Sequence, residues 1–140
     1  MPTIFTRILD GELPGVFVWR DVRCAAFLSI NPIADGHTLV VPVEEVDHWI
    51  DCSPDLAAHL FDVAHVIGRA QRQAFDCERV AVVVAGFEVP HTHVHVIPAN
   101  DMGDLAFANA KASVTRDELD HAAGKLRAAL SAMGRSEVAG

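Results

Sequence analysis

Three histidines alternate with threonine and valine in the run His-Thr-His-Val-His-Val-Ile, which occupies residues 91–97 between two prolines. Alternation with β-branched residues predicts a strand, and positions i, i+2 and i+4 of a strand face the same side. The imidazoles of His91, His93 and His95 are therefore expected to share one surface. Three of the eight histidines in the chain fall within these five positions, so the cluster needs a chemical explanation.

The residues alone leave three explanations open. The first is a solvent-facing strand that happens to be rich in histidine. The second is a zinc site formed by two neighbouring imidazoles and a distant ligand, since positions i and i+4 lie roughly 13 Å apart on a strand. The third is covalent catalysis. A neutral imidazole, whose ordinary pKa is about 6.5, can attack phosphorus while flanking imidazoles orient it and supply a proton.

Composition narrows the class of protein and of ligand. A length of 140 residues predicts one domain with a sizeable core. The 19 acidic and 11 basic residues give a formal charge of -8, which argues against a polynucleotide partner, although a compact anion can still bind through local donors. No basic leader with an apolar run and no membrane-spanning stretch is present in the sequence, so we expect a cytoplasmic protein without membrane contact. The three widely spaced cysteines form no CxxC motif and favour a reducing compartment.

The elements that must position the histidines follow from hydrophobic periodicity and turn residues. Five strands are predicted, at residues 16–19, 24–30, 37–41, 79–84 and 91–97. A short helical turn is predicted at residues 3–9, and two main helices at residues 53–75 and 115–133. The fourth strand is continuously apolar and is expected in the centre of the sheet. This order predicts an α+β domain with a mainly antiparallel sheet. Neither a Gly-rich phosphate loop nor a GxSxG motif is present.

The run His-Thr-His-Val-His-Val-Ile-Pro at residues 91–98 resembles the signature of the histidine triad (HIT) family. The run Gly-His-Thr-Leu-Val-Val-Pro at residues 36–42 is similar to a second block of that family. Shorter segments at residues 4–5, 11–14 and 26–30 resemble its N-terminal blocks. The third triad position is His rather than Gln, which separates the chain from the nucleotidyltransferase branch.

The resemblance implies a HIT-like α+β fold with a five-stranded, mainly antiparallel sheet and two main helices. The HIT domain would occupy residues 1–110, a C-terminal helix at residues 111–134 would pack on it, and residues 135–140 would form a loose tail. The resemblance also implies a phosphoramidase, hydrolase or nucleotidyl transferase that attacks a nucleoside 5'-phosphoryl group, at a phosphorus–nitrogen or phosphoanhydride bond, through a covalent histidine. The ligand would be a purine nucleotide or nucleotide conjugate, without a cofactor, and the protein would be a homodimer with joined sheets. Two alternatives stay open, a nucleotide- or partner-binding module with little turnover and a metal-dependent hydrolase that uses two triad histidines.

The resemblance assigns roles to individual residues. His93 would be the nucleophile, His95 would contact the phosphate, His91 would orient the triad, and His37 would support this network. The residues matched to nucleotide binding are Phe5, Leu13, Phe27, Leu28, Ser29, Ile30, Glu88 and Val89. Core packing would explain the apolar members of this set equally well from the sequence alone.

Four positions depart from the family pattern. Ser29 stands where an acidic residue often holds the ribose hydroxyls, and Glu88 stands where a hydroxyl is usually offered to the phosphate. Thr3 and Thr6 occupy the positions of two cysteines that bind zinc in some members, although His48 and His91 remain. We therefore expect catalysis without a metal, no structural zinc, and altered substrate contacts.

Overall fold

The structure is a computed structural model that describes residues 2–140. Its centre is one five-stranded sheet in which every neighbouring pair of strands is antiparallel. The strands follow one another across the sheet in the order β1 (Phe17–Arg20), β2 (Cys24–Leu28), β3 (Thr38–Pro42), β5 (Val94–Ala99) and β4 (Arg79–Val83). The antiparallel α+β architecture expected from the sequence is confirmed.

Residues 2–140 contain three helices, and each follows a capping residue whose hydroxyl accepts a backbone hydrogen bond of the first turn. They are α1 (Ile4–Leu9), α2 (Pro54–Ala74) and α3 (Arg116–Ala132), capped by Thr3, Ser53 and Thr115. Three short 3-10 turns lie at Trp49–Asp51, Met102–Leu105 and Phe107–Asn109. Among residues 2–140, no helix is long and apolar enough to cross a membrane.

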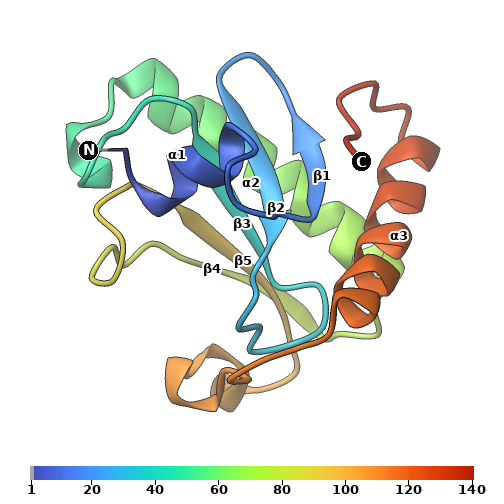
Figure 1. Cartoon of the computed structure of the whole chain (residues 1–140). Coiled ribbons are helices and arrows are strands. Elements are labelled where there is room, and N and C mark those ends of the chain that lie inside the picture. The colour runs from blue at the N-terminus through green and yellow to red at the C-terminus, as the bar shows by residue number, and fades with distance from the viewer. Residues whose placement is uncertain (1) are drawn as a thin grey trace.

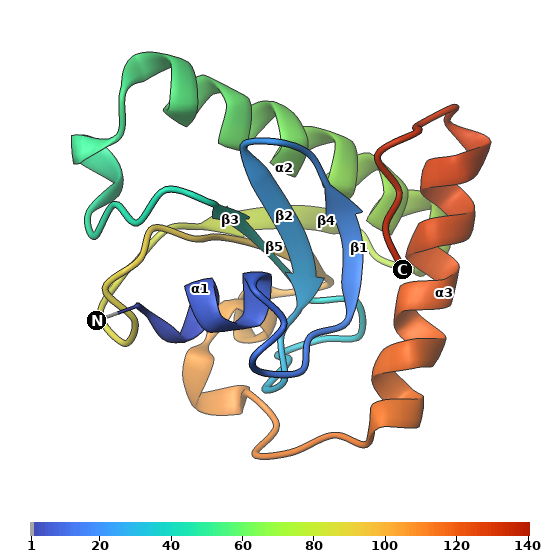
Figure 2. The same ribbon diagram turned by 45° about the horizontal axis from the view of Figure 1, so that its top comes forward.

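The helices cover the two faces of the sheet unequally (Figures 1 and 2). The long helix α2 lies across one face, α3 packs against α2 and β1, and the short helix α1 lies on the opposite face. Alternation along the strands divides the core accordingly. Val40, for example, belongs to the large cluster under α2, whereas Leu39 and Val41 belong to a smaller cluster with Phe5 and Phe27 under α1.

Two predictions about strands are wrong. β4 is an edge strand rather than a central one, and its apolar run is only partly covered, with Val82 46% exposed. The strand that carries the histidines starts at Val94 rather than at His91. The β3–β5 ladder ends at the pair Val40–Val94, because Pro42 has no N–H to donate and its carbonyl oxygen instead accepts from the His91 ring.

The last residues of the chain also differ from the loose tail predicted for residues 135–140. Val138 forms a β-bridge with Trp19, and the backbone N–H groups of Arg20 and Ala139 donate across this pairing at 3.0 and 3.1 Å. The tail therefore covers the outer edge of β1, which would otherwise present unpaired backbone groups.

Candidate active site

Four histidines gather on the sheet face that α1 covers. His95 lies on β5 opposite Leu39 of β3, and His93 comes directly before that strand. The His93 and His95 rings pack edge to face with centroids 4.9 Å apart, and Phe5 of α1 closes over His93 at 4.8 Å. His37 comes just before β3 and packs beside His95. His95 is partly accessible, whereas the other three are buried.

Backbone geometry fixes the tautomer of His93. Its Nδ1 lies 2.7 Å from the carbonyl oxygen of His91, and a carbonyl oxygen can only accept a hydrogen bond. The Nδ1 atom must therefore carry the hydrogen of the neutral ring. The Nε2 atom is left with a free lone pair, which is the state that a nucleophilic imidazole requires.

A relay of hydrogen bonds gives His95 the opposite polarity. The backbone N–H of Ile33 donates to Nδ1 of His37 at 3.1 Å, so the hydrogen of His37 resides on Nε2. That Nε2–H donates in turn to Nδ1 of His95 at 2.9 Å. His95 consequently carries its own hydrogen on Nε2. A lone pair on His93 and an N–H donor on His95 thus lie on adjacent rings.

His91 performs a different task from the one that shared strand parity predicts. Its Nε2–H donates to the carbonyl oxygen of Pro42 at 2.8 Å, and its Nδ1 accepts from the hydroxyl of Thr3 at 2.6 Å. Both ring nitrogens are therefore engaged with the protein. His91 anchors the backbone whose carbonyl holds His93, instead of presenting a free nitrogen beside the other two rings.

The N-terminal threonines complete this anchor. Glu45 accepts from the backbone N–H of Thr3 at 2.7 Å and from the hydroxyl of Thr6 at 2.6 Å. The hydrogen bonds tie α1 to the segment that follows β3. The positions expected to replace zinc ligands thus form a hydrogen-bonded cluster. Threonine hydroxyls do not replace cysteine thiolates as zinc ligands, and both ring nitrogens of His91 are already engaged, so these residues do not fit a zinc ion.

Burial favours the neutral form of all four rings. Desolvation lowers the pKa of His37 to about 4. Desolvation, reinforced by the neighbouring imidazoles of His93 and His37, lowers the pKa of His95 to about 3. The pKa values of His91 and His93 are also lowered, mainly by burial. At neutral pH the network therefore holds uncharged rings in the tautomers that the backbone dictates.

These shifts predict that acid destabilises the fold over a defined range. In the unfolded chain the histidines titrate near pH 6.5, so between that value and the folded pKa of about 4 the unfolded chain binds more protons. For His37 alone, the free energy of unfolding should fall by roughly 2 kcal/mol between about pH 7.5 and about pH 5, and this contribution should be constant above about pH 7.5. Urea unfolding at a series of pH values measures this fall in the free energy of unfolding. Asp21, whose pKa is lowered to about 2, changes the free energy of unfolding only at more acidic pH. A free energy of unfolding that is constant down to about pH 5 would contradict the account.

The structure brings several of the apolar residues expected in a nucleotide pocket to the triad. Phe5 contacts His91 and His93, and Phe27 packs edge to face against Phe5 with a centroid distance of 5.7 Å. Val89 is half-buried against the same cluster, and Leu13 is half-buried nearby in the chain after α1. Ile30 is 64% exposed just beyond the end of β2, where a ligand could cover it.

The remaining three expected residues lie outside this apolar cluster. Leu28 points into the large core under α2, on the face opposite the triad, so its assignment to the pocket is corrected. Ser29 is half-buried and its hydroxyl accepts from the backbone N–H of Asn31 at 3.2 Å. Glu88 is exposed in the loop between β4 and β5, and its charge acts on His93 by raising the pKa that burial lowers.

Phe107 was not predicted from the sequence. It lies in the 3-10 turn Phe107–Asn109, and its ring packs edge to face on His95 with a centroid distance of 4.9 Å while remaining 43% exposed. A single aromatic residue in a stretch expected to be loop gave no signal of this contact. Phe107 therefore forms part of the wall around the accessible side of His95.

The antiparallel sheet and the backbone-fixed histidine network define a histidine triad protein, and comparison with known proteins agrees. The model of the HIT domain family matches residues 10–102, so the chain belongs to the HIT family. The "Protein hit" of Bacillus subtilis is 33% identical over 106 residues, which cover 72% of this chain and 73% of that protein. A more distant relative is the adenylylsulfatase HINT3 of Arabidopsis thaliana, 27% identical over 103 residues, which cover 70% of this chain and 52% of that protein.

Solved structures share the whole architecture. A Hit-like protein involved in cell-cycle regulation from Bartonella henselae superposes with a TM-score of 0.82 at 28% identity, covering 91% of this chain and 96% of that one. A hypothetical histidine triad nucleotide-binding protein from Sulfolobus tokodaii superposes with a TM-score of 0.83 at 26% identity, covering 94% and 93%. The fold is therefore that of the HIT proteins, including the C-terminal helix beyond the matched domain.

Proposed function

We propose that this HIT protein is a nucleotide hydrolase, phosphoramidase or nucleotidyl transferase that attacks a nucleoside 5'-phosphoryl group with His93. The observation that carries the proposal is the hydrogen bond from His93 Nδ1 to the carbonyl oxygen of His91, because it leaves the Nε2 lone pair free. The neighbouring His95 supplies an N–H donor at the same place. Nothing in a purely structural role requires these two opposite tautomers on adjacent rings.

The chemistry proceeds in two displacements. In the first, the Nε2 lone pair of His93 forms a bond to phosphorus and the bond from phosphorus to the leaving group breaks. The electron pair departs with the leaving group, which takes up a proton from solvent. His95 Nε2–H donates to a non-bridging phosphoryl oxygen and stabilises the charge that develops there. The His91 carbonyl continues to accept from Nδ1 and stabilises the positive charge on the nucleotidylated ring.

In the second displacement, water attacks the same phosphorus, the nitrogen–phosphorus bond breaks, and the electron pair returns to Nε2 of His93. The water proton is released and a nucleoside monophosphate leaves. A second acceptor in place of water would make the protein a transferase. At the end of the cycle His93 is again the neutral ring with its hydrogen on Nδ1, the form that its lowered pKa favours.

The ligand class is supported by the wall of the site and by relatives. Phe5 and Phe27 pack as buried rings against the triad. The partly exposed ring of Phe107 beside His95 is the apolar surface suited to a base or ribose. The Sulfolobus tokodaii protein is described as nucleotide-binding and the Arabidopsis protein as an adenylylsulfatase. A purine nucleotide or nucleotide conjugate is the ligand that we infer for this chain.

Incubation with adenosine 5'-phosphoramidate tests this proposal, with and without an excess of chelator. We expect adenosine monophosphate to form at the same rate in both cases, because the network needs no metal to fix its tautomers. Loss of turnover with chelator that added zinc restores would favour a metal-dependent hydrolase instead. Saturable nucleotide binding without turnover would favour a nucleotide-binding module over an enzyme.

We also propose a symmetric homodimer joined through the free edge of β4. The tail covers the edge of β1, so among residues 2–140 the outer edge of β4 is the remaining open side of the sheet. Val82 on that strand is 46% exposed, and two-fold pairing is the commonest way to cover such an edge. Light scattering should give about twice the chain mass. A monomer at micromolar concentration would contradict the joined sheet.

A further inference from the structure

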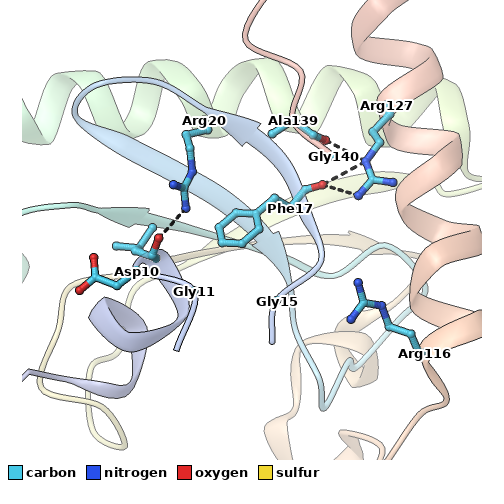
Figure 3. Close-up of a pocket in the computed structure, with 10 residues that line it drawn as sticks. Asp10, Gly11, Gly15, Phe17, Arg20, Arg116, Arg127, Ala139 and Gly140 are labelled. Carbon is cyan, nitrogen blue, oxygen red and sulfur yellow. Dashed lines mark hydrogen bonds between the residues drawn. The ribbon is translucent and has the colours of Figure 1, made fainter. Parts of the chain in front are cut away.

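We propose that a cleft between α1, β1 and α3 binds a small phosphorylated compound through Arg20, Arg116 and Arg127. The cleft has a volume of about 570 Å³, which lies within the range of small-molecule sites. Its lining comes from the turn after α1, from β1, from α3 and from the last residues of the chain (Figure 3). None of the four histidines of the candidate active site lines it.

The cleft is separated from the triad by packed aromatic rings. Phe17 lines the cleft, and its ring packs against Phe27 with a centroid distance of 5.6 Å. Phe27 packs in turn against Phe5, which contacts His93. A ligand of the cleft and a ligand of the triad would therefore occupy opposite ends of one apolar cluster without sharing a contact to the histidines.

The charge of the cleft opposes the charge of the whole chain. The formal charge of the chain is -8, yet the cleft is lined by three guanidinium groups against the side-chain carboxylate of Asp10 and the last residue, Gly140. Figure 3 shows Arg20, Arg127 and Arg116 placed around Phe17 from three sides. A local concentration of positive charge on an acidic protein selects a compact anion, since a long polyanion would meet the surrounding negative surface.

Arg127 is held in place by the backbone and retains donors for a ligand. Its Nε donates to the carbonyl oxygens of Phe17 and Ala139 at 3.0 and 2.8 Å, and its Nη2 donates to that of Phe17 at 2.6 Å. Within residues 2–140, its Nη1 has no hydrogen-bond partner. Little side-chain freedom remains to be lost when a ligand binds to a guanidinium fixed in this way.

Arg20 is oriented by similar means. Its Nη2 donates to the carbonyl oxygen of Leu9 at 2.9 Å, and its guanidinium lies over the Phe17 ring at 4.6 Å from the centroid. Arg116 pairs with Asp120 one turn along α3 through Nε. Both arginines keep further N–H donors that make no hydrogen bond within the described residues. Such planar donors bind phosphate oxygens in pairs, which favours a phosphate group as the ligand.

The shape of the wall leaves room for this group. Gly11 and Gly15 line the cleft. The backbone at Gly15 is closely packed, since a side chain there would meet Ile8 at 2.6 Å and Phe17 at 3.3 Å. Gly11 has a φ of +83°, and a Cβ atom placed on it would meet no other atom within 4 Å, so the wall there is open backbone. A phosphate can therefore lie against the main chain at Gly11, whose own N–H already donates to the carbonyl oxygen of Ile8 at 3.2 Å, while the guanidinium groups supply the free donors.

An NMR titration of the ¹⁵N-labelled full chain with inorganic pyrophosphate, at constant ionic strength, tests the proposal. We expect saturable shifts of the Gly11 and Gly15 amides and of the Arg127 Nε–H signal. These shifts should persist in the His93→Asn variant, which separates the cleft from the triad. Shifts confined to triad amides, or shifts that grow linearly without saturation, would overturn the proposal.

Variants locate the donors. The double change Arg20→Gln and Arg116→Gln should weaken pyrophosphate binding by about tenfold or more, the loss expected for a charge-assisted hydrogen bond. Arg69→Gln with Arg72→Gln, on the exposed surface of α2, is the matched control for charge and should leave affinity unchanged. Arg127 is left unchanged because its guanidinium donates to the backbone carbonyl oxygen of Phe17 in β1, and its loss could disturb the fold. Equal affinity in both double variants, or equal affinity for succinate and pyrophosphate, would contradict a phosphate site.

Discussion

Replacing His93 by asparagine should lower turnover of adenosine 5'-phosphoramidate by at least about 10⁴-fold, the scale seen when a nucleophile is removed. The amide nitrogen of asparagine can take the place of Nδ1 and donate to the carbonyl oxygen of His91, which lies 2.7 Å from Nδ1 in the native chain. The variant therefore keeps the hydrogen bond that organises the loop. It loses Nε2, and with it the lone pair that attacks phosphorus.

Two measurements separate chemistry from folding in this variant. The midpoint of urea unfolding and the affinity for adenosine monophosphate should stay close to those of the native chain. His65→Asn is the matched control, because His65 is an exposed histidine on α2, and it should leave turnover unchanged. Turnover of His93→Asn near the native rate would show that another group attacks phosphorus.

The double change Ser29→Asp and Glu88→Ser should raise turnover of the same substrate by about a hundredfold, the effect of restoring one hydrogen bond in the transition state. Glu88 cannot donate to a phosphate as a carboxylate, and its negative charge reaches His93. A serine there supplies a donor and removes the repulsion. Aspartate at position 29 adds an acceptor for the ribose hydroxyls in place of a weaker neutral one.

The structure strengthens this prediction at Glu88. Strand parity would turn Glu88 away from the triad, but residues 84–93 form no strand, so the parity rule does not apply to it. Glu44→Ser is the matched control, because Glu44 is an exposed glutamate outside the site. Slower turnover in the double variant than in the native chain would mean that Glu88 or Ser29 already makes a productive contact.

Local sequence signals predicted the elements that depend on neighbouring residues. The helix starts at Ser53 and Thr115 follow from short side-chain caps, and both form as expected. The third strand, predicted at residues 37–41, forms as β3 at Thr38–Pro42. Only the resemblance predicted that His37 lies beside the triad, because 54 or more positions separate His37 from the triad histidines along the chain.

Contacts between distant segments account for what the sequence did not predict. The hydroxyl of Thr3 reaches His91 across 88 positions, and no local pattern marks that hydrogen bond. The position of β4 at the sheet edge depends on which strand pairs with β3, and a continuous apolar run does not determine it. The tail pairs with β1 because an open sheet edge is available there, although its own composition favours no strand.

The central claim is a covalent bond between the Nε2 atom of His93 and the phosphorus of a nucleotide. Rapid quenching of the native chain with adenosine 5'-phosphoramidate under alkaline conditions, followed by peptide mass spectrometry, tests it most directly. We expect an added adenylyl mass on the peptide that contains residues 91–97, assigned to His93 by fragmentation and absent from His93→Asn. Formation of adenosine monophosphate with no such adduct at any quench time, or an adduct on another residue, would contradict it.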